Sequence, residues 1–154
     1  MSSKPARNIS IGDFILNNEA VFAWTVYVYV PNKAGTGKTK LKFGVEFMHV
    51  TPERRLELLQ EFRDKAEERK RLEDIPDVEK SQEDIEAIRQ VLSFERMLLE
   101  ETVVRFTNGI RDKQDKDVSA DEDTRAKMFS NSWARDALLY SYQKALEGRS
   151  AEGN

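Results

Sequence analysis

The glycine-rich segment at residues 34–39 is the first place in the sequence where chemistry could be expected. Gly35, Gly37 and Lys38 resemble the end of a phosphate-binding loop, in which backbone amides and a lysine hold nucleotide phosphates. Such a loop needs a further glycine five residues before Gly37, where this chain has Asn32, and it must lead into a helix. The following residues alternate like a strand, so we expect residues 31–38 to form a mobile hairpin loop that binds no nucleotide.

A second segment, residues 115–126, resembles the start of a calcium-binding loop. Asp115, Asp117 and Ser119 have the spacing of the first three oxygen ligands of such a loop. The sixth position should be a glycine and is Ala120, and the twelfth should be a bidentate glutamate and is Ala126. We therefore expect a solvated loop that leads into a helix, and no metal site.

The remaining reactive side chains do not combine into a catalytic set. The chain has one histidine, His49, and no cysteine, which excludes thiolate nucleophiles, zinc–thiolate sites, disulfides and a histidine cluster. No serine has a histidine and an acid at a recognisable spacing, and the carboxylates lie among lysines and arginines, as on a solvated surface. We expect His49 to pack or cap at the end of a strand, and we expect neither an enzyme nor a cofactor.

Composition and charge narrow the possible class of protein further. The chain has 154 residues, of which 39% are hydrophobic and 34% charged, and its net charge is −3. Residues 1–50 carry six Lys/Arg against three Asp/Glu, too mild an excess for a nucleic-acid-binding face. No apolar run reaches the roughly 18 residues of a spanning helix, and the N-terminus lacks the apolar core of a secretory signal. These features predict one cytosolic domain with no nucleic-acid or membrane partner.

The elements that must position any site begin with a β-rich part, residues 1–50. Phe22, Trp24, Val26, Val28 and Val30 alternate with smaller or amphipathic residues, and Leu41, Phe43, Val45 and Phe47 alternate with polar ones. With the turn-forming loop between them, the two runs predict an antiparallel hairpin. Because a lone hairpin is marginal in water, a third strand or a helix must cover it, and residues 9–16 could supply one.

The rest of the chain predicts about four helices packed on that hairpin, an α+β fold. The predicted parts are a helix at 51–72, a linker at 73–80, a helical part at 81–148 and a flexible tail at 149–154. Cap signals mark helix starts at Thr51, Ser81 and Ser119, and Asn131 or Ser132 precedes the last helix. Apolar residues keep helical spacing from Ile85 to Phe106, which predicts one long central helix that stops at Asn108-Gly109, ahead of a polar loop at 111–118.

The last two predicted helices are crowded with aromatic side chains. Phe129, Trp133, Tyr140 and Tyr142 fall within fourteen residues, more than one short amphipathic helix can bury alone. Tyr142 shares a predicted core face with Leu138 and Leu146. Trp and Tyr dominate interface energetics, so Phe129, Trp133 and Tyr140 are the predicted partner-binding residues, with burial in the core as the alternative.

The order of these features resembles the tail assembly chaperones of long-tailed bacteriophages. The resemblance covers most of residues 20–148 and lies in short motifs within 24–31, 42–47, 51–56, 101–110, 131–142 and 145–148. It implies a non-enzymatic factor of the host cytoplasm that binds the tape measure protein, keeps it soluble and helps recruit tail-tube subunits, and is absent from the finished virion.

Other functions remain open at this point. A small NTPase using the 35–39 loop is one, although the loop pattern argues against it. A phage regulatory or anti-defence protein that binds a host factor is the main alternative, because its composition and fold would look the same. Whether the chain forms a homo-oligomer is also left open. A tape measure gene directly downstream would favour the chaperone.

Overall fold

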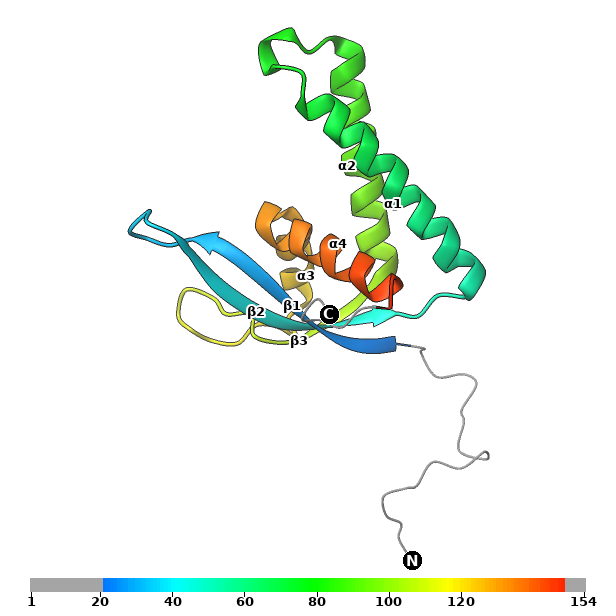
Figure 1. Ribbon diagram of the computed structural model, residues 1–154. Coiled ribbons are helices and arrows are strands. Elements are labelled where there is room, and N and C mark those ends of the chain that lie inside the picture. The colour runs from blue at the N-terminus through cyan, green and yellow to red at the C-terminus, as the bar shows by residue number, and fades with distance from the viewer. Residues whose placement is uncertain (1–20, 149–154) are drawn as a thin grey trace, which may run out of the picture.

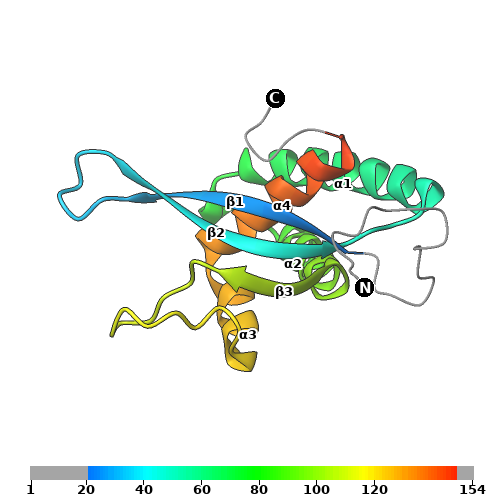
Figure 2. The same cartoon turned by 90° about the horizontal axis from the view of Figure 1, so that it is seen from below.

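The computed structural model describes residues 21–148 and has the predicted α+β architecture (Figure 1). The elements along the chain are β1 (Val21–Pro31), β2 (Lys38–Met48), α1 (Pro52–Glu73), the short 3₁₀ helix η2 (Asp77–Glu79), α2 (Gln82–Thr102), β3 (Val103–Asn108), α3 (Glu122–Ser130) and α4 (Ser132–Leu146). The described strands form one antiparallel sheet in the order β1-β2-β3. Helices cover one face of this sheet, as the view from below makes clear (Figure 2).

The predicted hairpin is confirmed. β1 and β2 pair in continuous register from Val21 with Met48 to Pro31 with Lys38. The side chains of Phe43, Val45 and Phe47 are buried on the face that carries the helices. Lys40 and Lys42 alternate with them and are exposed, as the period of a strand requires.

The third strand forms at residues where helical spacing had predicted a helix. The prediction that the central helix continues through Val103 and Phe106 is wrong, because α2 ends at Thr102 and residues 103–108 form β3. From Thr102 to Thr107 every residue except Arg105 is β-branched or aromatic, and such residues fit a pleated surface better than a helix.

A bulge explains why the apolar spacing of β3 looked helical. Val103 pairs with Phe47 and Arg105 with Glu46, so Val104 has no partner in the register. The extra residue lets Val103 and Phe106 both be buried although they are three positions apart. The other source suggested for a third strand, residues 9–16, lies outside the described residues.

The helices α1 and α2 form a long arm that extends away from the sheet (Figure 1). The predicted cap at Thr51 is confirmed, since its hydroxyl accepts a hydrogen bond from the Arg54 amide at 3.1 Å. The predicted capping box at Ser81 is also confirmed, with reciprocal bonds to Asp84 of 3.1 and 2.9 Å. The 73–80 linker makes the turn at the tip of the arm and contains η2.

The last two helices return over the sheet. The predicted capping box at Ser119 is wrong: α3 begins at Glu122, and the Ser119 hydroxyl instead accepts a hydrogen bond from the Ile110 amide at 3.0 Å. The Asn131 side chain caps α4 through the Ala134 amide at 3.1 Å, and Gly148, with φ +78°, follows the helix end. The predicted face of α4, including Leu138, Tyr142 and Leu146, is buried.

The core lies between the sheet and the helices. Residues with essentially no exposed surface come from both strands of the hairpin and from α1, α2 and α4: Val26, Val45, Phe47, Leu58, Leu99 and Leu138. The Phe47 and Tyr142 rings meet edge to face with centroids 5.0 Å apart, which joins the sheet to α4. Within residues 21–148, no helix is long and apolar enough to span a bilayer.

Candidate functional site

A groove between β1 and α4 brings together two of the three predicted partner-binding residues. Trp133 and Tyr140 line it, and their side chains are 51% and 61% exposed. The groove has a volume of about 530 Å³, and its aromatic lining is completed from the sheet by Trp24, Tyr27 and Tyr29. Five aromatic side chains from two elements therefore surround one open groove. We call this the β1–α4 groove.

The α4 wall of the groove is set by the helical period. Trp133 and Tyr140 are seven residues apart, two turns along the helix, and Ala137 lies between them on the same face. The opposite face, with Leu138 and Tyr142, is buried in the core. The Asn131 cap fixes where the helix begins and so places Trp133 in the first turn. The sequence that buries one face of α4 thereby exposes these two aromatics on the other.

The β1 wall comes from an edge strand of the sheet. Trp24 and Val28 share the face that packs against the helices, whereas Tyr27 and Tyr29 occupy the intervening positions of the strand. Because all four line the groove, it passes around the outer edge of β1. Tyr29 is 55% exposed. The sequence analysis did not assign Trp24, Tyr27 or Tyr29 to a site, and the alternating aromatics of β1 were the signal that could have done so.

Two lysines stand at this groove, each above an aromatic ring. The Lys40 ammonium lies 4.3 Å from the centroid of the Tyr27 ring, and that of Lys144 lies 4.8 Å from the centroid of Tyr140. Cations over exposed rings are attracted by the negative ring face. Asp136 is the one carboxylate in the described lining. The groove therefore combines apolar aromatic surface with a positive rim.

Phe129, the third predicted partner-binding residue, does not line this groove. Its side chain is 1% exposed. The ring meets Phe106 edge to face at 6.4 Å and is covered by the Arg125 guanidinium at 4.9 Å. The side chain of Phe129 belongs to the core, because α3 packs it against β3 rather than presenting it to solvent.

Two buried polar side chains do not line the groove, Tyr142 of α4 and Glu95 of α2. Burial raises the pKa of Tyr142 to about 12, and its hydroxyl has no hydrogen-bond partner within the described part of the chain. Burial also raises the pKa of Glu95, although its carboxylate is 2.7 Å from an Arg69 nitrogen. Neither group opens into the groove, so we assign both to packing rather than to a binding function.

The segments that resembled chemical motifs have structural roles. The 31–38 loop connects two strands and uses its own amides: those of Gly35 and Thr36 donate to the backbone and side-chain oxygens of Asn32. In the loop at 111–118, Asp112 accepts hydrogen bonds from the backbone amides of Gln114 and Lys116, and Asp117 accepts one from the amide of Ser119. His49 packs on the Phe22 ring, with centroids 4.7 Å apart. Among residues 21–148, no group of three or more His, Asp or Glu side chains could hold a metal ion.

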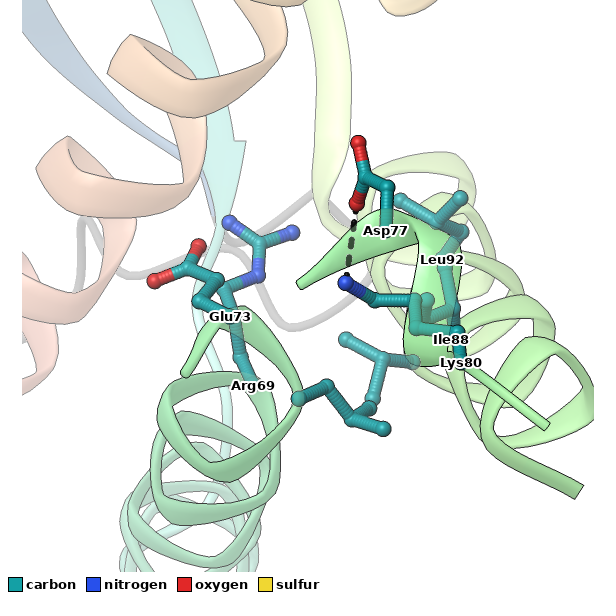
Figure 3. Close-up of a pocket in the computed structure, with 8 residues that line it drawn as sticks. Arg69, Glu73, Asp77, Lys80, Ile88 and Leu92 are labelled. Carbon is teal, nitrogen blue, oxygen red and sulfur yellow. Dashed lines mark hydrogen bonds and ion pairs between the residues drawn. The ribbon is translucent and has the colours of Figure 1, made fainter. Parts of the chain in front are cut away.

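A second cavity lies near the tip of the arm, with a volume of about 360 Å³ (Figure 3). Its apolar wall comes from Leu72, Ile88, Val91 and Leu92. Three of its charged groups already have partners: the Lys80 ammonium donates to the Ile75 carbonyl at 2.6 Å and to Asp77 at 2.9 Å, and Arg69 pairs with Glu95. These contacts hold the turn between α1 and α2 together, so we assign the cavity to the packing of that turn. The β1–α4 groove is the stronger candidate site.

Comparisons with known proteins add no assignment. No protein-family model matches the chain, and no curated protein or solved structure does so either.

Proposed function

We propose that this protein is a phage tail assembly chaperone that binds an apolar helical segment of the tape measure protein in the β1–α4 groove. One observation carries the proposal: Trp133 and Tyr140 are exposed on one face of α4 and line a single groove with Trp24 and Tyr29 of β1. Exposed Trp and Tyr side chains that surround a groove are typical of interface anchors. The order of sequence motifs supplies the identity of the partner.

The dimensions of the groove suit a helix. The lining positions on α4 run from Trp133 to Lys144, a span of twelve residues that corresponds to about 16 Å of helix. A partner helix laid along this wall would place about three turns in contact. Amphipathic helices bind such grooves through apolar residues spaced three and four apart. The tape measure protein, which the resemblance describes as long, helical and prone to aggregate, would be kept soluble because its apolar stripe is covered.

The role is non-enzymatic and belongs to the host cytoplasm. Aromatic surface and two lysines can hold a partner, but they include no nucleophile with an adjacent base. Recruitment of tail-tube subunits is the second activity that we propose on the basis of the resemblance. A regulatory or anti-defence protein would use the same groove on a host factor, so the identity of the partner decides between the two functions.

Co-expression with the neighbouring tape measure protein tests the proposal. We expect the wild type to raise the soluble fraction of that protein and to co-purify with it. Trp133→Ala should weaken the complex by about 2 kcal/mol, or roughly thirtyfold in affinity, while circular dichroism stays unchanged. Met97→Ala is the matched control, because Met97 is 67% exposed on α2 and does not line the groove.

Two outcomes would count against this function. If the wild type neither solubilises nor co-purifies with the tape measure protein, the chaperone hypothesis is removed and a host factor becomes the partner to seek. If Trp133→Ala and Met97→Ala bind equally well, the β1–α4 groove is not the binding site, whatever the partner is.

A further inference from the structure

The charge around the β1–α4 groove points to the chemistry of the bound helix. We infer that the groove selects an apolar helix whose stripe is flanked by carboxylates, which pair with Lys40 and Lys144. This inference rests on the proposed function and adds a selection rule to it.

The ammonium groups of Lys40 and Lys144 are available to pair with a carboxylate of a partner. Among residues 21–148, neither the Lys40 nor the Lys144 ammonium pairs with a carboxylate, and each lies instead over a tyrosine ring of the groove. An ammonium over a ring keeps most of its donors free for an incoming acceptor. An ion pair with a partner carboxylate would therefore need no existing salt bridge to break.

The two lysines lie in a region of the surface with an excess of positive charge. Residues 21–45 contain no aspartate or glutamate, and four lysines of this stretch are exposed: Lys33, Lys38, Lys40 and Lys42. On the α4 side Asp136 is the one acid among the described lining residues. The rim is thus positive although the whole chain carries −3. A positive rim favours acidic partners in both encounter rate and register, and it disfavours lysine-flanked helices.

The positions of the two lysines also bear on the selection. Lys40 comes from β2 and Lys144 from the C-terminal turn of α4, so the two cations reach the groove from different walls. The aromatic residues Trp24, Trp133 and Tyr140 supply the apolar surface of the groove. A helix with leucines on one face and glutamates on its two flanks would match both features at once.

Three synthetic helical peptides of about 18 residues test the selection. They share one leucine and alanine face and carry glutamate, glutamine or lysine at the flanking positions. Fluorescence anisotropy of the labelled peptides against the full chain should give affinities in the order glutamate, glutamine, lysine. We expect each step to be about threefold to tenfold, and the differences should shrink in about 0.5 M salt.

A double variant and a control variant test whether Lys40 and Lys144 are the residues responsible for the selection. The Lys40→Glu/Lys144→Glu double variant should reverse the order, so that the lysine-flanked peptide binds best. Lys113→Glu is the matched control, because it removes one exposed lysine of the 111–118 loop, away from the groove lining, and should leave the order unchanged.

The possible failures are distinguishable. Equal affinities of the three peptides would overturn the selection rule and leave the groove as a helix-binding site. An order that persists in the double variant would overturn the assignment to Lys40 and Lys144. If no peptide binds, both the selection rule and the groove as a helix-binding site fall.

Discussion

At the scale of single residues, Glu95 places a carboxylate in a largely buried position of the arm. It lies on α2, and its side chain is 11% exposed. Arg69 of α1 and Arg135 of α4 attract its charge, and Asp136 repels it. Burial outweighs this attraction, because the pKa of Glu95 is raised in spite of the ion pair with Arg69. The carboxylate therefore joins three helices at a cost in stability.

The raised pKa of Glu95 gives the pH dependence a definite sign. Between its ordinary value of 4.5 and the raised value, the folded chain holds a proton that the unfolded chain has released. The contribution of this group to stability is thus present below pH 4.5 and is lost as the pH rises through the folded pKa. Other carboxylates with lowered pKa values, such as Asp84 and Asp117, act in the opposite direction.

The prediction is therefore a difference between two proteins. Glu95→Gln should match the wild type in unfolding free energy near pH 4 and exceed it at pH 7, because the amide keeps a hydrogen-bonding oxygen without the buried charge. Urea denaturation at several pH values measures both proteins, and the contributions of other groups cancel in the difference. A variant that loses stability relative to the wild type as the pH rises would show that Arg69 and Arg135 outweigh burial.

At the scale of elements, Gly109 directly follows β3 and packs closely against the backbone of β2. Its φ is +91°, and a Cβ atom at this position would lie 2.9 Å from both the Lys42 carbonyl oxygen and the Phe43 Cα. Those atoms belong to the backbone of β2, which cannot move aside without disturbing the sheet. A side chain at position 109 would therefore strain both its own backbone and the pairing of β2 with β3.

Gly109→Ala should accordingly destabilise the fold by more than a change of backbone preference alone. Gly35 is the matched control, since its φ is +71° and a Cβ there meets nothing within 4 Å. We expect Gly35→Ala to cost about 1 kcal/mol and Gly109→Ala at least about 1 kcal/mol more, both measured by chemical denaturation. Equal costs for the two substitutions would mean that β2 yields to the added methyl group.

An element could be predicted where the interactions that form it join residues close together in the sequence. The strand alternation around Phe43 and the caps at Thr51, Ser81 and Asn131 depend on near neighbours in sequence, and the structure confirms them. The end of α2 was mistaken because a bulge let apolar residues three apart share one face. A bulge depends on pairing with β2, which is distant in sequence.

The residues of the candidate site also divide into those that local sequence patterns predict and those that depend on tertiary contacts. The exposed face of α4 follows from helical period, so Trp133 and Tyr140 could be selected from the sequence. Phe129 could not be separated from them, because its burial depends on contact with Phe106 of β3. Trp24 and Tyr29 join the groove only when the fold lays α4 along the edge strand. The sequence thus supplied one wall of the groove, and tertiary packing supplied the other.

At the scale of the whole molecule, the structure has a packed body and a thinly packed arm. The base of the arm is fixed by Leu58, Leu98 and Leu99, which are almost fully buried. Toward the tip, the buried apolar side chains of α1 and α2 are Leu72 and Val91. Because local opening costs little where few apolar groups are buried, the two ends of the same helices should differ in stability.

Amide hydrogen exchange should reveal a gradient along the arm. We expect the amides of residues 66–90 to exchange faster than those near Leu58 and Leu99, and the paired amides of β2 to exchange slowest. Leu72→Ala should speed exchange at the tip and leave β2 unchanged, because it removes one of the two buried side chains there. Val26→Ala is the contrasting control: Val26 is fully buried in the sheet, so its truncation should speed exchange throughout the body. Protection at the tip equal to that of β2 would mean that arm and body unfold as one cooperative unit. In that case the extension of the arm in Figure 1 would carry no separate stability.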